Sequence, residues 1–163
     1  MVRNRRRVVV LAALAGLGSV ACGNGDGEPL TREAFVERGS AICAETTQRI
    51  DEAAQGAFSE QRVIPPAEEI IAFASETVAP QVGNELERLS ELEPPSDDAE
   101  RIEQILEAGR EGVDTVRRDP TIVQSGADDG FVRYRELASD YGLENCGGIS
   151  DETRAEIAGI GRG

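Results

Sequence analysis

Two Pro-Pro pairs, Pro65-Pro66 and Pro94-Pro95, and the dipeptide Asp119-Pro120 divide the chain into segments with helical periodicity. Proline lacks the N–H that a helix interior requires and restricts the residue before it, so these positions end one helix or begin the next. Between them apolar residues recur at three- and four-residue spacing, the pattern of an amphipathic helix. Because short loops join antiparallel neighbours, the sequence predicts an all-α, up-down four-helix bundle at residues 31–147.

Four helices are expected, over residues 31–58, 67–92, 96–118 and about 129–141. Thr31 is the predicted N-cap of the first helix, and Asp128 or Asp129 caps the fourth. Gly142 suits the left-handed position that follows a helix. Pro80 lies inside the second helix, where we expect a bend and the loss of one backbone hydrogen bond.

The same spacing predicts which residues face the core. In the first helix they are Phe35, Gly39, Ile42, Thr46, Ile50, Ala53 and Ala57. In the second they are Ile71, Ala74, Val78, Val82 (or Gln81), Glu85 or Leu86, and Leu89. In the third and fourth they are Ile102, Ile105, Leu106, Gly109, Val113, Val116, Phe131, Tyr134, Leu137, Ala138 and Tyr141.

Residues 1–21 have the composition of an export signal. Arginines precede the uncharged run from Val8 to Ala21, which is shorter than the roughly 20 residues that span a bilayer. We therefore expect cleavage before Cys22 and a protein on the outer face of the cytoplasmic membrane. Arg6-Arg7 fits a twin-arginine signal as well as a plain basic region, so the export route stays open.

Cys22 is the predicted site of lipid attachment. Val20, Ala21 and Cys22 match a bacterial lipobox, whereas Ser19 stands where leucine is usual and also suits ordinary signal peptidase. The chain has three cysteines, and a lipid on Cys22 leaves the other two as one pair. Several acyl chains would hold the protein at the membrane. The alternative is a free or intermolecularly bonded Cys22.

We predict a disulfide between Cys43 and Cys146. It would tie the first helix to the chain just after the fourth, and these helices are neighbours in an up-down bundle. Closing a loop of about 100 residues is worth about 4.7 kcal/mol on the loop-entropy model. Two reactive thiols are the alternative, although nothing cationic in the sequence lies beside either cysteine.

The ends of the mature chain are expected to lie outside the bundle. Residues 22–30 are rich in glycine and would form a flexible tether. Residues 148–163 form a C-terminal tail, in which Ser150–Ala158 could make a short helix.

The charge of the chain restricts its partners. The whole sequence has a net charge of −14, with 31 acids against 17 basic residues, all of them arginine. Four arginines leave with the signal, so the mature charge is about −18. Nucleic acids and anionic lipid surfaces need basic patches, so neither is an expected partner. The acidity itself favours solubility over a specific cationic partner.

The absence of histidine restricts the chemistry. It removes Ser/His/Asp and Cys/His catalysis and the usual zinc ligand sets, and no nucleotide or haem motif occurs. Carboxylate pairs such as Glu68-Glu69 and Asp97-Asp98 are simpler to interpret as first-turn residues favoured by the helix dipole. We expect no enzymatic activity, no metal and no cofactor.

Short motifs carry a family resemblance. Ala41-Ile42-Cys43-Ala44, the break Leu92-Glu93-Pro94-Pro95 and the close Tyr141-Gly142-Leu143-Glu144-Asn145-Cys146-Gly147 resemble those of small secreted lipoproteins of high-GC Gram-positive bacteria. The resemblance covers about residues 30–147. It implies an anchored helical domain and supplies no catalytic residues.

Two functions follow as hypotheses. In the first, the protein is a non-enzymatic interaction module that presents a helical groove or acidic face to another envelope protein or a cell-wall component. In the second, it is a lipoprotein that holds a small ligand or cation between its helices. A cavity beside Pro80, lined by Phe73, Val78 and Val82, would favour the second. A closed core with an exposed apolar stripe would favour the first.

Overall fold

The computed structural model of the chain describes residues 29–58, 65–124, 129–150 and Thr153. The predicted signal, Cys22, nearly all of the predicted tether and most of the predicted tail lie outside these residues.

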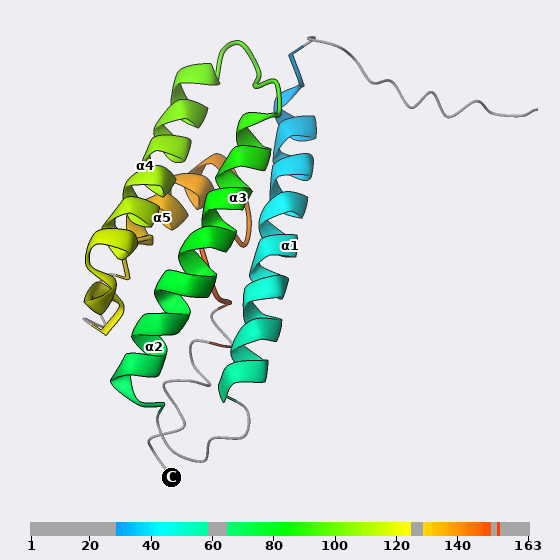
Figure 1. Ribbon diagram of the computed structural model, residues 1–163. Coiled ribbons are helices and arrows are strands. Elements are labelled where there is room, and N and C mark those ends of the chain that lie inside the picture. The colour runs from blue at the N-terminus through cyan, green and yellow to red at the C-terminus, as the bar shows by residue number, and fades with distance from the viewer. Residues whose placement is uncertain (1–28, 59–64, 125–128, 151–152, 154–163) are drawn as a thin grey trace, which may run out of the picture.

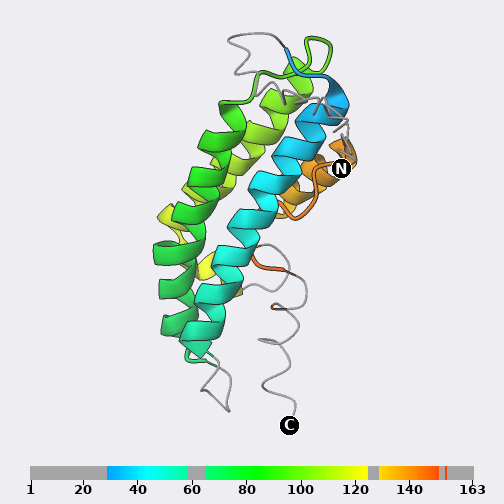
Figure 2. The ribbon, with the colours of Figure 1, turned by 90° about the vertical axis from the view of Figure 1, so that its right-hand side faces the viewer.

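The described residues form helices and no strand (Figure 1). In chain order they are α1 (Arg32–Phe58), α2 (Ala67–Phe73), the π-helical turn η1 (Ala74–Val78), α3 (Ala79–Ser90), α4 (Ala99–Arg118), the 3₁₀ turn η2 (Pro120–Gln124) and α5 (Val132–Tyr141). Because α2, η1 and α3 make one continuous rod, the architecture is an up-down four-helix bundle, as the sequence predicts (Figures 1 and 2).

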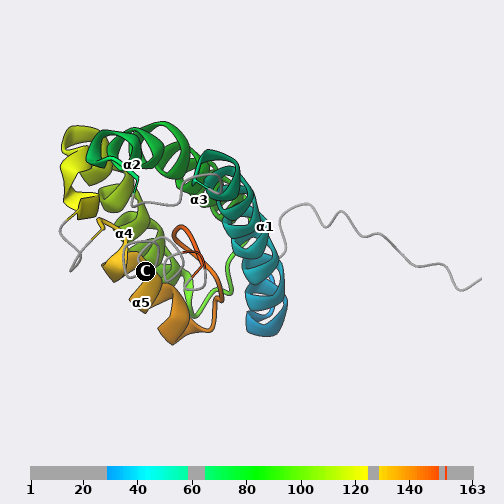
Figure 3. The same ribbon diagram turned by 90° about the horizontal axis from the view of Figure 1, so that it is seen from below.

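The rod α2–α3 packs between α1 and α4, and α5 packs on α4. Residues 142–150 lie between α1 and α5 and close the remaining side of the bundle (Figure 3). Leu143 from this segment is buried against Gly39, where a Cβ would lie 2.5 Å from Leu143 Cδ2. A glycine at position 39 therefore lets the C-terminal segment reach the core.

The irregularity that Pro80 predicts is the π-helical turn η1. Pro80 is the second residue of α3 and has no N–H to donate to the carbonyl of Glu76. The wider turn just before it accommodates the ring and the missing bond within a continuous helical rod.

Two predicted helix ends, Thr31 and Gly142, are confirmed, whereas the predicted cap of the fourth helix at Asp128 or Asp129 is wrong, because Phe131 holds the N-cap position of α5 without a side-chain capping bond. Thr31 Oγ1 accepts a hydrogen bond from the N–H of Ala34 at 3.2 Å, as an N-cap should. Gly142 adopts φ 109°, and its N–H donates to the carbonyls of Ala138 and Ser139. Asp129 Oδ1 accepts from the N–H of Phe131 at 3.0 Å, just before α5 begins at Val132.

Two other details differ from the prediction. The third helix begins at Ala99, after a turn at residues 96–98. Asp98 holds the N-cap position without a side-chain capping bond, and its carboxylate instead accepts from the hydroxyl of Tyr141 at 2.9 Å. In the second half of α1 the buried face is displaced by one residue: Ala57 is exposed and Ala53 half-buried, whereas Ala54 and Phe58 are buried. The face moves because α1 contacts two neighbours, α3 on one side and the 142–150 segment on the other.

Candidate functional site

Glu85 lies in the bundle core with no exposed surface, although it is a carboxylic acid. Helix α3 places it there, one turn from Val82 and Leu89, which are also buried. It is the one acidic residue among the described residues that is classed as buried. Buried acids are rare unless they are paired, so this residue needs an explanation.

The two oxygens of the Glu85 carboxyl have different surroundings. Oε1 accepts hydrogen bonds from the hydroxyl of Tyr134 at 2.8 Å and from the N–H of Gly147 at 3.1 Å. Oε2 is buried and has no hydrogen-bond partner. The hydroxyl of Thr46 lies close to the carboxyl but donates to the carbonyl of Ile42 at 3.2 Å.

The predicted disulfide is present beside this carboxyl. Cys43 on α1 and Cys146 are joined with a Cα–Cα distance of 4.5 Å. Cys43 is fully buried and Cys146 is 7% exposed. One ligand-type atom from each of Cys43, Glu85 and Cys146 lies within 4.8 Å of the other two. The core therefore holds two sulfurs and a carboxyl in one cluster, which we call the Glu85–cystine cluster.

Burial raises the pKa of Glu85 from its ordinary 4.5 to about 7. The hydrogen bonds from Tyr134 and Gly147 favour the charged form and act against this increase in the pKa. The pKa of Tyr134 is raised well above its ordinary value by burial, reinforced by Glu85. Near neutral pH the Glu85 carboxyl thus exists as a mixture of the neutral and charged forms.

Polar contacts other than the disulfide also hold residues 142–150 in place. The hydroxyl of Thr47 lies 2.7 Å from the carbonyl oxygen of Asn145 and 2.9 Å from that of Gly148. Arg135 donates to the carbonyl of Gly147 at 3.1 Å. The N–H of Ser150 donates to a carboxylate oxygen of Asp51 at 3.1 Å.

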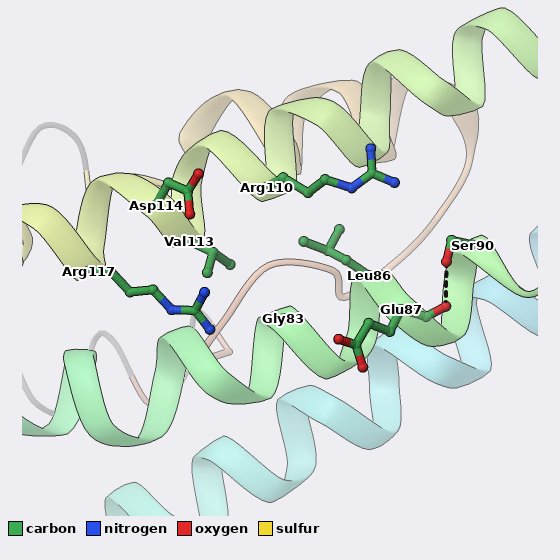
Figure 4. Close-up of a pocket in the computed structure, with 8 residues that line it drawn as sticks. All are labelled: Gly83, Leu86, Glu87, Ser90, Arg110, Val113, Asp114 and Arg117. Atoms are coloured by element: carbon green, nitrogen blue, oxygen red, sulfur yellow. Dashed lines mark hydrogen bonds between the residues drawn. The ribbon is translucent and has the colours of Figure 1, made fainter.

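A groove of about 250 Å³ lies between α3 and α4, on the surface of the bundle (Figure 4). Its residues are Gly83, Leu86, Glu87 and Ser90 from α3, and Arg110, Val113, Asp114 and Arg117 from α4. Both arginines extend from α4 along the side of the groove, as Figure 4 shows. Gly83 leaves the wall open, because a Cβ there would still be 3.9 Å from Arg117 Nη2.

The two arginines of this groove differ in whether they form an ion pair. Arg110 pairs with Glu103 at 2.8 Å, whereas Arg117 forms no ion pair with the part of the chain that the structure describes. Leu86 and Val113 supply apolar surface between the charges. Glu87 and Asp114 also line the groove, so its acids and arginines balance, and Arg117 is the group at which it can accept an acidic side chain together with an apolar one.

The three residues of the predicted cavity lie near the π-helical turn. Val82 is fully buried in the core, and Phe73 packs edge-on against Phe58 with ring centroids 5.2 Å apart. Val78 is half-buried, and its side chain is 4.0 Å from where a Cβ on Gly148 would be. The cavity itself stays a prediction.

The sequence predicts the roles of Cys43 and Cys146, whereas no role was expected for Glu85 or for the groove. Glu85 lies on the apolar face of α3 beside Leu86, so the spacing could have indicated an acid at a core position. Arg110 and Arg117 are seven residues apart and therefore share one face of α4. Their relation to Gly83 depends on how α3 and α4 pack, which spacing alone does not give.

No protein-family model matches this chain, and neither the curated proteins nor the solved structures contain a match. Across the described residues, no helix combines the length and the apolar character needed to cross a membrane.

Proposed function

We propose that this chain is a lipid-anchored, non-enzymatic interaction module on the outer face of the cytoplasmic membrane. The basic and apolar leader before Cys22 supports export, and a lipid on Cys22 would account for the third cysteine once Cys43 and Cys146 are joined. A glycine-rich tether would leave the helical bundle free to contact a neighbour.

The observation that carries the interaction role is the α3–α4 groove. Its lining includes Arg117, a guanidinium group without an ion pair among the described residues, beside Leu86 and Val113, together with Arg110 and the acids Glu87 and Asp114. Its volume of about 250 Å³ is below the roughly 300–1,000 Å³ of pockets that bury small molecules, so it suits side chains of a partner protein better than a free ligand. The partner we propose is an envelope protein with a carboxylate next to an apolar side chain.

Charge reversal at Arg117 tests this role. A photoreactive amino acid at Ser90, which lines the groove, is compared in intact cells with one at Gln104, an exposed residue that does not line it. We expect a product of one discrete mass from Ser90 and not from Gln104. Arg117→Glu should abolish that product by placing a like charge opposite the partner's carboxylate.

Arg118→Glu is the matched control, because Arg118 is an exposed neighbour on α4 that is not part of the groove. It should leave the Ser90 product unchanged. Equal products from Ser90 and Gln104, or a Ser90 product that survives Arg117→Glu, would contradict the proposed role. A product of the mass of a glycan rather than a protein would replace the proposed partner with a cell-wall component.

A further inference from the structure

We propose that the reduced protein has a zinc site formed by the Sγ atoms of Cys43 and Cys146 and a carboxylate oxygen of Glu85. The proposal is independent of the interaction role. The zinc site would lie on the opposite side of α3 from the groove and would form only when the disulfide is reduced.

The positions of the three donors support this site. Their ligand atoms lie within 4.8 Å of one another. Zn–S bonds of about 2.3 Å and Zn–O bonds of about 2.0–2.2 Å place the ligands of one ion about 3.5–3.8 Å apart. Once the S–S bond is open, the two sulfurs can move apart to this spacing, and the carboxylate oxygen already lies within 4.8 Å of both. Two thiolates with one carboxylate suit zinc, whereas oxygen-only sets suit calcium or magnesium.

The unpaired oxygen of Glu85 is a second and independent observation. Oε1 already accepts from Tyr134 and Gly147, so those contacts fix the orientation of the carboxyl. Oε2 is buried with no partner and so has a lone pair for a cation. The Tyr134 and Gly147 contacts would serve as the outer-shell bonds that orient a metal-bound carboxylate.

Contacts other than the S–S bond also hold the two cysteines near each other. Cys43 lies in the middle of α1, and Cys146 is in the segment that Thr47, Arg135 and Asp51 hold by hydrogen bonds. Opening the disulfide therefore leaves the two thiols as neighbours. Cys146 is 7% exposed and gives the side from which a reductant and a metal ion approach.

The chemistry balances with a dithiol as the reductant. One thiolate of the dithiol attacks Cys146 Sγ and breaks the S–S bond, and its second thiol then displaces Cys146 from the mixed disulfide. The dithiol becomes a disulfide, and the protein gains two electrons and two protons as two thiols. Zn²⁺ then displaces both thiol protons, and the Glu85 proton where it is held, to solvent, and its two positive charges offset two of the three negative charges of the ligands.

Cobalt titration of the phosphine-reduced protein tests the site. All samples carry Cys22→Ser so that two thiols remain, and the phosphine is removed under argon before Co²⁺ is added. With water as the fourth ligand, we expect thiolate-to-cobalt charge-transfer absorbance and visible tetrahedral bands at one ion per chain, lost on adding Zn²⁺. The oxidised protein should show neither band.

Glu85→Gln should weaken Zn²⁺ affinity by at least about tenfold. Loss of a group that only orients a ligand costs about that much, and Glu85 is itself a ligand. Glu87→Gln is the control, because this exposed acid lies on the same helix away from the cluster. If the reduced chain loses helicity, Zn²⁺ should restore it. A reduced protein that is folded without charge-transfer absorbance, one that stays unfolded in excess Zn²⁺, or equal affinities for Glu85→Gln and the parent would overturn the site.

Discussion

At the scale of single residues, Glu85 places an ionisable carboxyl in the core, and its charged form destabilises the fold. A carboxyl with one oxygen bonded to Tyr134 and Gly147 and the other unpaired costs free energy whenever it is charged. The native state therefore holds the Glu85 proton more tightly than the unfolded chain does.

The stability of the protein should depend on pH through Glu85. The pKa of Glu85 is about 7 in the folded protein against an ordinary 4.5. Protonation of Glu85 therefore adds its full contribution to the free energy of unfolding below pH 4.5, and this contribution is lost as the pH rises to 7. The difference amounts to about 3 kcal/mol. Urea unfolding of the parent and of Glu85→Gln from pH 4.5 to 8 should show this fall as a changing difference between the two proteins.

Other carboxylates contribute equally to both proteins, so they cancel in that difference. Glu87→Gln, at an exposed position, should follow the parent at every pH. A difference between the parent and Glu85→Gln that does not change with pH would show that the native pKa of Glu85 is not raised.

Two glycines should respond to alanine in opposite ways. A Cβ at Gly112 would lie 2.5 Å from the carbonyl oxygen of Gly130 and 2.7 Å from Phe131 Cδ1, and backbone cannot move as a side-chain tip can. Gly112→Ala should therefore destabilise the protein by about 1–3 kcal/mol. A Cβ at Gly56 in α1 would meet nothing within 4 Å, so Gly56→Ala should stabilise it by up to about 1 kcal/mol.

Both free energies come from urea unfolding at one pH, with circular dichroism confirming unchanged helicity. Equal effects at the two positions would mean that the close approach of α4 to the Gly130–Phe131 segment does not constrain position 112.

At the scale of the elements, the sequence predicts the helices well because prolines mark where they end. The Pro-Pro pairs and Asp119-Pro120 separate the helices, and every predicted inward residue of α4 is buried. In α1 the second half was misplaced by one position, since three- and four-residue spacing cannot show that the helix contacts two neighbours. An irregularity near Pro80 could be predicted from the proline, but not that it would be a π-helical turn.

The candidate site was less predictable than the helices. The parity of the cysteines gave the Cys43–Cys146 bond. We did not predict that residues 142–150 close the side of the bundle between α1 and α5. These residues bind Thr47, Asp51 and Glu85, which lie far from them in the sequence. The groove was missed for the same reason: it belongs to two helices at once.

Removing the disulfide tests how strongly it ties α1 to the C-terminal segment. Replacing both Cys43 and Cys146 by alanine should lower the free energy of unfolding by about 2–5 kcal/mol, because the bond closes a loop with a sequence separation of 103. Urea unfolding measures the loss, and Cys22→Ser, which leaves the bond intact, is the control. A double variant as stable as the parent would mean that the hydrogen bonds to residues 142–150 suffice.

At the scale of the whole molecule, the chain forms an acidic helical bundle, and we propose that the leader exports it and that a lipid on Cys22 retains it at the membrane. The net negative charge, −14 for the whole sequence and more negative without the signal, keeps neighbouring copies apart. In the α3–α4 groove two arginines balance the acids Glu87 and Asp114. The disulfide fits an oxidising location, where such bonds persist.

Intact-mass analysis of the protein from its native membrane fraction, with and without reductant, tests this account most directly. We predict a chain that begins at Cys22 and carries a thioether-linked diacylglycerol with an N-acyl group, and that gains the mass of two hydrogen atoms on reduction. A chain with a free, alkylatable Cys22 thiol, or one whose mass the reductant leaves unchanged, would contradict it.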